Sequence, residues 1–186
     1  MTLVALEHKH GDLDVIKFNT GILALQETKF EKGAKIAMEL LESNPENWRY
    51  HRLRSECLFA LGLFDDALIS VERSFYHYPT ASTAHLQAQI LLGLGNVNGA
   101  LEVIKIAVEM EPSNNVREFY ADIMAMNELY LDAANEYSSL LQSKPSIEVR
   151  RKRGKCFYAI DEYENALVDF IAVHREKMNN ETRPDF

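Results

Sequence analysis

The densest run of side chains that could do chemistry is basic and lies between residues 150 and 155. Arg150, Arg151, Lys152, Arg153 and Lys155 supply five cations within six positions. Such a run could bind an acidic peptide, a phosphate or RNA. It could equally belong to a solvated helix, because residues on a helix turn by about 100° each and these five cannot all face one surface. No aromatic residue lies between them, which disfavours single-stranded nucleic acid, whose bases stack on aromatic side chains.

Two other patterns resemble ligand sites without completing one. Gly93, Gly95 and Gly99 resemble a phosphate-binding loop, but a dinucleotide loop follows a strand and opens a helix, whereas these glycines lie between two expected helices. His8 and His10 could hold a metal, but a zinc site needs three or four protein ligands and no further His or Cys is nearby. We therefore expect no metal and no cofactor.

Catalytic arrangements are also missing from the sequence. No grouping of Ser, Cys and His suggests a nucleophile with its base. Paired carboxylates such as Asp65 and Asp66 fall at expected helix starts, where negative charge complements the helix dipole. We therefore expect no enzyme activity and no small-molecule substrate.

The elements that must position these groups are marked by small residues at a nearly constant interval. The first small column has gaps of 34, 33, 33 and 33 residues, and a second small column runs in step with it. A bulkier apolar residue precedes each member of the second column, and a proline follows the first four. Self-similarity at this period indicates a stacked repeat array. The four columns are Gly21, Ser55, Ala88, Ala121 and Gly154; Gly33, Ala67, Ala100, Ala133 and Ala166; Phe30, Phe64, Val97, Tyr130 and Tyr163; and Pro45, Pro79, Pro112 and Pro145.

Each repeat contains two expected helices. In residues 48–61 the apolar side chains have helical spacing rather than alternation. Gly62 then ends the helix, because glycine accepts a left-handed backbone at little cost. A second helix follows over residues 64–76, and Pro79 ends the unit because proline cannot continue a helix. The place of Gly62 is taken in the later units by Gly95, Glu128 and Asp161.

Composition limits the class of protein. The chain has 186 residues and a formal charge of −8, from 28 acidic and 20 basic groups, which disfavours general binding to nucleic acid. No apolar run approaches the roughly 18–20 residues that cross a bilayer, and the start is too short and too charged for a secretory signal. Cys57 and Cys156 occupy equivalent places three repeats apart, too far for a disulfide. We expect a reducing compartment, the cytoplasm or the nucleus.

The repeat resembles the tetratricopeptide repeat family. The matching segments include residues 62–67 (GLFDDA) with Pro79 and residues 163–166 (YENA), and the register covers residues 14–178. Ankyrin repeats have a similar period but carry a Thr-Pro-Leu-His type segment, which is absent here. The resemblance implies an all-α fold, a right-handed superhelix (solenoid) of about five antiparallel helix-turn-helix repeats.

The expected domain organisation follows this register. We expect an N-terminal segment over residues 1–13 that is poorly ordered or forms a short cap, and a C-terminal tail over residues 179–186. The five repeats between them are expected at residues 14–47, 48–80, 81–113, 114–146 and 147–178.

The resemblance also implies that the first helix of each repeat lines a groove for an extended peptide or a partner helix. Its lining would be mixed, with apolar residues and opposite charges at intervals. The residues implied to contact a partner are Phe18, Ile22, Arg49, Arg52, Glu56, His85, Gln89, Glu118, Phe119, Asp122, Arg151, Lys152 and Lys155.

The resulting functional hypothesis is a non-catalytic scaffold or adaptor for a protein or peptide partner. One family subgroup binds acidic chaperone tails through a carboxylate clamp, but Phe18, Ile22 and Leu53 stand at clamp positions where Lys and Asn are expected. Two alternatives stay open. One is an RNA-binding helical-repeat protein using the basic residues, and the other is a co-chaperone module without a standard clamp.

The end of the last repeat predicts a further contact. The last helix, expected over residues 162–177, carries Leu167, Phe170, Ile171 and Val173, and the polar residues after it do not suggest a capping helix. Stacked repeats need polar outer faces at their ends. We therefore expect an exposed apolar strip there, covered by a partner, by a second copy of the chain, or by a longer parent chain.

Overall fold

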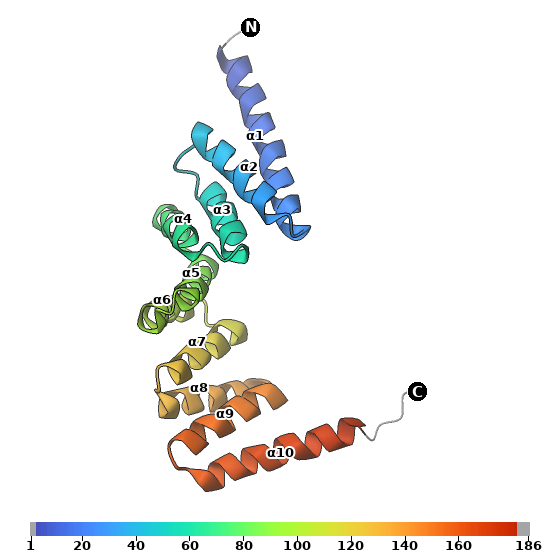
Figure 1. Cartoon of the computed structure of the whole chain (residues 1–186), viewed down its shortest axis with the longest axis vertical. Helices are drawn as coiled ribbons and strands as arrows, with labels where there is room; N and C mark the ends of the chain where they lie inside the picture. The colour runs from blue at the N-terminus through green and yellow to red at the C-terminus, as the bar shows by residue number, and fades with distance from the viewer. Residues whose placement is uncertain (1–2, 182–186) are drawn as a thin grey trace. The chain divides into compact units, whose positions relative to one another are not determined.

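The computed structural model describes the backbone of residues 3–181 and the side chains of residues 13–176 and 178. This part of the chain forms ten helices and no strand (Figure 1). The helices are α1 (Leu3–Gln26), α2 (Phe30–Ser43), α3 (Trp48–Ala60), α4 (Phe64–His77), α5 (Ala81–Gly93), α6 (Val97–Met110), α7 (Asn114–Met126), α8 (Tyr130–Ser143), α9 (Ile147–Ala159) and α10 (Tyr163–Glu181).

The chain divides into two compact units, and we describe each by itself. Unit 1 is Met1–Val103 and unit 2 is Ile104–Phe186, so the boundary lies within α6. In unit 1, each helix from α1 to α4 contacts the next helix in the sequence, and in unit 2 each helix from α7 to α9 does the same. First helices of successive repeats also contact one another: α1 with α3, α3 with α5, and α7 with α9.

The two small columns lie where helices approach most closely. All ten of their residues are buried. A Cβ atom added at Gly33 would lie 2.6 Å from Sγ of Cys57, and one added at Gly154 would lie 2.8 Å from Cε1 of Phe170. Larger residues there would overpack the contacts. Gly33 stands where the family usually has alanine because the Cys57 sulfur fills that space.

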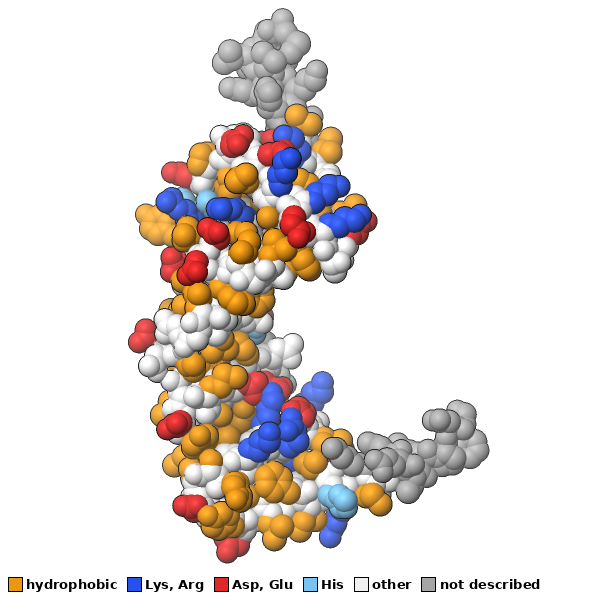
Figure 2. All heavy atoms as spheres, in the orientation of Figure 1, with side chains coloured by type: hydrophobic (Ala, Val, Ile, Leu, Met, Phe, Trp, Pro, Cys, Tyr) orange, Lys and Arg blue, Asp and Glu red, His pale blue; other side chains and the backbone are white. Residues whose placement is uncertain are grey.

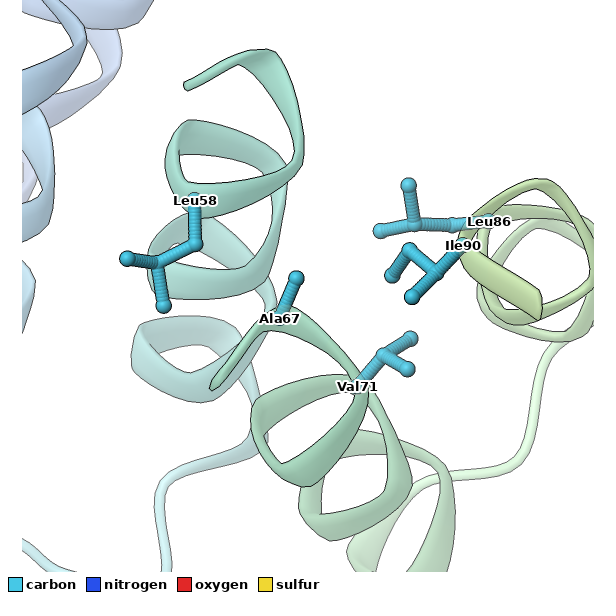
Figure 3. Close-up of a cluster of buried hydrophobic side chains, with 5 residues drawn as sticks. All are labelled: Leu58, Ala67, Val71, Leu86 and Ile90. Atoms are coloured by element: carbon cyan, nitrogen blue, oxygen red, sulfur yellow. The ribbon is translucent and has the colours of Figure 1, made fainter. Parts of the chain in front are cut away.

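The contact between one repeat and the next is apolar, as the α4–α5 pair illustrates. Ala67 and Val71 of α4 are fully buried against Leu86 and Ile90 of α5. Figure 3 shows Leu86 and Ile90 pointing from α5 toward these two residues. Burial of such side chains supplies about 1.5–3 kcal/mol each, which stacks the repeats.

The turn inside each repeat has one fixed form. Three residues separate the first helix from the second in every repeat, and the middle one has a left-handed backbone with φ between 59° and 75°. Glycine adopts this conformation freely, whereas other residues are strained in it. The five residues are Thr28, Gly62, Gly95, Glu128 and Asp161.

The turn between repeats explains the single longer interval in the sequence. Residues 44–47 separate α2 from α3, whereas only three residues separate α4 from α5, α6 from α7 and α8 from α9. Three of the first helices start after a capping residue, whose side chain accepts a hydrogen bond from a backbone N–H that the first turn leaves unpaired. Asn47 accepts from Arg49, Thr80 from Thr83 and Ser146 from Val149.

The helix-turn-helix architecture predicted from the sequence is confirmed, whereas the expected boundaries of the repeats stay a prediction. At the N-terminal end, α1 begins at Leu3, so the expected segment 1–13 falls largely within a helix. At the other end α10 continues to Glu181, and residues 182–186 of the expected tail lie outside the described residues. Among the described residues, no helix combines the length and apolar character that crossing a membrane requires.

Candidate functional site

Unit 1 has a pocket between the first helices of its first two repeats. Phe18 and Ile22 line it from α1, and five residues line it from α3, in a volume of about 300 Å³. The α3 residues recur on one side of the helix, because positions three and four apart share a face. They are Trp48, Arg49, Arg52, Leu53 and Glu56.

The charged side chains of this pocket are held in place by neighbours. Nε of Arg52 donates to Oε1 of Glu56 at 2.8 Å, and its Nη1 donates to the Ser82 hydroxyl on α5 at 2.9 Å. The Arg49 guanidinium lies 5.3 Å from the centre of the Trp48 ring, within the range of a cation–π contact. The pocket therefore offers an apolar wall beside oriented cations.

His85 and Gln89, the expected groove residues of the third repeat, lie half-buried on α5. Neither lines the pocket between α1 and α3. Burial lowers the pKa of His85 below its ordinary value, because desolvation disfavours the charged imidazolium. His85 is therefore a neutral contact at neutral pH.

Unit 2 has a larger pocket, of about 430 Å³, built from α7, α8 and α9. Its walls combine apolar, acidic and basic side chains. Arg151, Lys152 and Lys155 line it from α9, opposite Asp122 of α7. The remaining lining residues are Ala125, Met126, Tyr130, Tyr137 and Cys156.

A hydrogen-bonded network joins the walls of the unit 2 pocket. Nζ of Lys152 donates to Oε1 of Glu118 at 2.7 Å and to Oδ2 of Asp122 at 2.8 Å. The Tyr137 hydroxyl donates to Oδ1 of Asp122 at 2.6 Å. Burial is the larger cause that raises the pKa of Tyr137, and the hydrogen bond to Asp122 is the second. Burial alone would lower the pKa of Lys152, but the hydrogen bonds that it donates to Asp122 and Glu118 raise it above the ordinary value. Lys152 therefore stays charged and fixed across the pocket.

Most of the basic run is engaged within unit 2. Arg153 donates to both carboxylate oxygens of Asp169 on α10, at 2.8 and 2.7 Å, and Arg150 lies 3.7 Å from the same fully buried carboxylate. Arg151 pairs with Glu148 one turn earlier. Figure 2 shows Lys and Arg side chains gathered beside Asp and Glu side chains in the region of α9.

Lys155 differs from its neighbours in the basic run. It is exposed at the pocket, and no ion pair is found for it within the described part of the chain. It is therefore the cation of this run best placed to meet a ligand carboxylate.

Most of the expected groove residues thus fall into two groups of neighbours, whereas His85, Gln89 and Phe119 belong to neither. Phe18, Ile22, Arg49, Arg52 and Glu56 meet in the unit 1 pocket, and Asp122, Arg151, Lys152 and Lys155 meet in the unit 2 pocket. Glu118 joins the second group through Lys152. Phe119 is half-buried on α7 outside that pocket's lining.

The sequence did not predict that a second helix, α8, contributes side chains to the unit 2 pocket. Tyr130 and Tyr137 of α8 reach it although only first helices were expected to line a groove. Tyr137 occupies the repeat position of Val71 and Ile104, which are buried aliphatic residues. The signal was therefore a tyrosine in an aliphatic column, long enough to carry its hydroxyl to Asp122.

The groups best suited to metal or redox chemistry are buried or dispersed. No group of three or more His, Cys, Asp and Glu side chains that could hold a metal occurs among the described residues. Cys57 and Cys156 are buried free thiols, one in each unit, and burial raises the pKa of both to about 11. Cys156 lines the unit 2 pocket, and Cys57 packs in a buried apolar cluster with Ala37 and Leu53.

Comparison with known proteins identifies the repeat. A family model described as tetratricopeptide repeat matches residues 18–81 and 85–146, which is more than half of the chain. The chain belongs to the tetratricopeptide repeat family. A comparison with curated proteins finds no match.

Solved structures of tetratricopeptide repeat proteins share the fold. The chain is similar to a crystal structure of MamA with a TM-score of 0.84 and 13% identity, over 95% of this chain and 98% of that one. It is also similar to YrrB, titled a TPR protein with an unusual peptide-binding site, with a TM-score of 0.77 and 14% identity, over 84% of this chain and 82% of that one. At these identities the likeness shows the fold alone.

Proposed function

We propose that this chain is a non-catalytic scaffold or adaptor that binds a peptide or helix of a partner protein along its first helices. The observation that carries the proposal is the pair of pockets on those helices, one in each unit. Both place apolar side chains beside oriented charges. A peptide offers alternating apolar and charged side chains, so it complements such a surface.

The unit 2 pocket favours a segment with an apolar side chain next to a carboxylate. Ala125, Met126 and Tyr130 supply the apolar wall, and Lys155 and Arg151 supply cations at its edge. Asp122 is already neutralised by Lys152, so it does not repel an acidic ligand at full strength. YrrB, with a peptide-binding site named in its title, is an analogy within the same family.

RNA binding ranks below peptide binding because the basic run has internal partners. Four of its five cations form ion pairs within unit 2, with the carboxylates of Asp169, Glu148, Glu118 and Asp122. A polyanion would have to compete with these carboxylates on a chain of net charge −8.

Selection of ligands from a random peptide library on the intact protein, followed by titration calorimetry, tests the proposal. Peptides selected on the wild type are expected to lose at least about tenfold in affinity on Lys155→Glu, because one reversed contact in a pocket is worth about 1.4 kcal/mol or more. The matched control is Lys105→Glu, an exposed lysine outside both pockets. Peptides that bind both variants like the wild type would show that the pocket is not the site.

A further inference from the structure

The outer side of α10 carries an apolar face whose counterparts in the other repeats are buried or half-buried. Leu167 is 58% exposed and Phe170 is half-buried. Phe170 occupies the repeat position of Ala37, Val71 and Tyr137, each at most 1% exposed. Leu167 occupies the position of Ala134, which is 1% exposed on α8, and of Ala34, Leu68 and Leu101, which are half-buried.

The outer side of α1 also carries an exposed apolar face, which corresponds to the side of a first helix that packs on the preceding repeat. Ile16 is 62% exposed and Leu23 is 52% exposed. In the later first helices of the array, the position of Ile16 is held by the buried residues Tyr50, Thr83 and Val149 and by the half-buried Val116. The position of Leu23 is held by Cys57, Ile90 and Cys156, which are also buried.

These two faces are the two halves of one repeated contact. Inside the units, the second helix of one repeat packs on the first helix of the next, as α2 does on α3, α4 on α5 and α8 on α9. In the α4–α5 contact, Val71 at the position of Phe170 meets Ile90 at the position of Leu23. Within the described residues no helix covers either face, so each presents one half of a contact that the fold makes repeatedly.

We propose that copies of this chain associate end to end, with α1 of one copy packing on α10 of another in the register of an internal repeat contact. The two faces differ, so the association is heterologous and continues beyond a dimer as the concentration rises. Burial of Leu23 and Leu167 drives the contact, and the peptide pockets take no part in it.

Polar residues limit the strength of this contact. Asn19 of α1 stands where the internal contacts have Leu53 and Leu86, and His174 of α10 stands where they have the half-buried Phe75 and Leu141. The association is therefore weaker than an internal contact and reversible on dilution.

Sedimentation equilibrium of the full chain tests the proposal. The weight-average mass of the wild type is expected to rise at least about twofold above 21.3 kDa as the protein is concentrated into the millimolar range. Leu23→Glu and Leu167→Glu, each with one face disrupted, are expected to stay at the monomer mass. Both residues are exposed, so neither charge disrupts the core, and circular dichroism checks the retained helix.

Mixing the two variants separates this contact from symmetric pairing. Leu23→Glu keeps an intact α10 and Leu167→Glu keeps an intact α1, so an equimolar mixture is expected to form a dimer at about twice the monomer mass. The control is Ile69→Glu, which changes an exposed apolar residue of α4 away from both faces and is expected to associate like the wild type. A wild type that stays monomeric, a single variant that still dimerises alone, or a mixture that stays monomeric would each overturn the proposal.

Discussion

At the scale of single residues, Asp169 determines how the basic run is used. Its carboxylate is fully buried and accepts two hydrogen bonds from Arg153, with Arg150 nearby. A buried carboxylate persists only with such partners, because an unpaired buried charge is strongly unfavourable. Part of a run that resembles a ligand site is therefore a structural link between α9 and α10.

Asp169→Ala is expected to lower the free energy of unfolding by about 3 kcal/mol, because it leaves the Arg153 guanidinium without its carboxylate. Urea denaturation followed by circular dichroism measures this change. The control is Arg150→Ala, whose more exposed pair at 3.7 Å is expected to contribute less than about 1 kcal/mol. Equal losses in the two variants would contradict the structural role of the Arg153–Asp169 pair.

His51 makes stability sensitive to acid. The ring is buried, Nε2 donates to the Pro45 carbonyl at 2.7 Å, and Nδ1 is buried without a partner. Burial lowers the pKa of His51 below its ordinary value; the hydrogen bond to the Pro45 carbonyl opposes this, and Arg73, His77 and Arg54 nearby add to the lowering. Protonation at Nδ1 would place an unpaired positive charge in the core.

The sign of the pH effect follows from this lowered pKa. Stability from neutral His51 is fully present above the unfolded-state pKa of about 6.5 and is lost as the pH falls from there through the lower folded-state value. His51→Gln, which does not titrate, is expected to show a smaller loss of unfolding free energy between pH 7 and pH 5 than the wild type. Urea titrations at both pH values measure the difference, and an unchanged pH dependence would contradict it. Some dependence is expected to remain, since burial also lowers the pKa of His85.

At the scale of elements, the left-handed turn is the conformation that defines each hairpin. Five residues of four different types adopt it in equivalent places, so the packing of the two helices imposes this backbone regardless of side chain. Repeats with Gly62 or Gly95 adopt this backbone without strain. Repeats with Thr28, Glu128 or Asp161 adopt it with strain, because their Cβ atom is crowded in the left-handed conformation.

Exchanging residue types between two turns tests this reading. Gly62→Ala is expected to destabilise by about 1 kcal/mol, because a Cβ atom there meets nothing within 4 Å and the whole effect comes from the backbone. Glu128→Gly is expected to stabilise by about 0.5 kcal/mol, since relief of strain exceeds the entropy that glycine adds to the unfolded chain. Thermal unfolding of both variants measures the shifts, and shifts of the same sign would contradict the argument.

At the scale of the whole molecule, the repeat architecture was predictable and much of the site was not. The small columns specify helix hairpins because a close helix contact excludes large side chains, and that requirement recurs once per repeat. Residues such as Arg52 and Lys152 were expected because the family resemblance implies which positions of each first helix face a groove. Partners that lie on different helices, such as Asp169 for Arg153, leave no periodic signal, and neither does the reach of Tyr137 from α8.

The two buried cysteines have a practical consequence for studying the intact chain. A thiol reagent attacks only the thiolate, which burial suppresses at both positions, and must first reach a sulfur enclosed by packed helices. Labelling of Cys57, which is 0% exposed, therefore proceeds when the surrounding helices open, whereas labelling of Cys156 also depends on access through the unit 2 pocket that it lines. Because Cys57 belongs to unit 1 and Cys156 to unit 2, mass spectrometry of the labelled peptides gives a separate rate for each half of the native protein without any engineered probe.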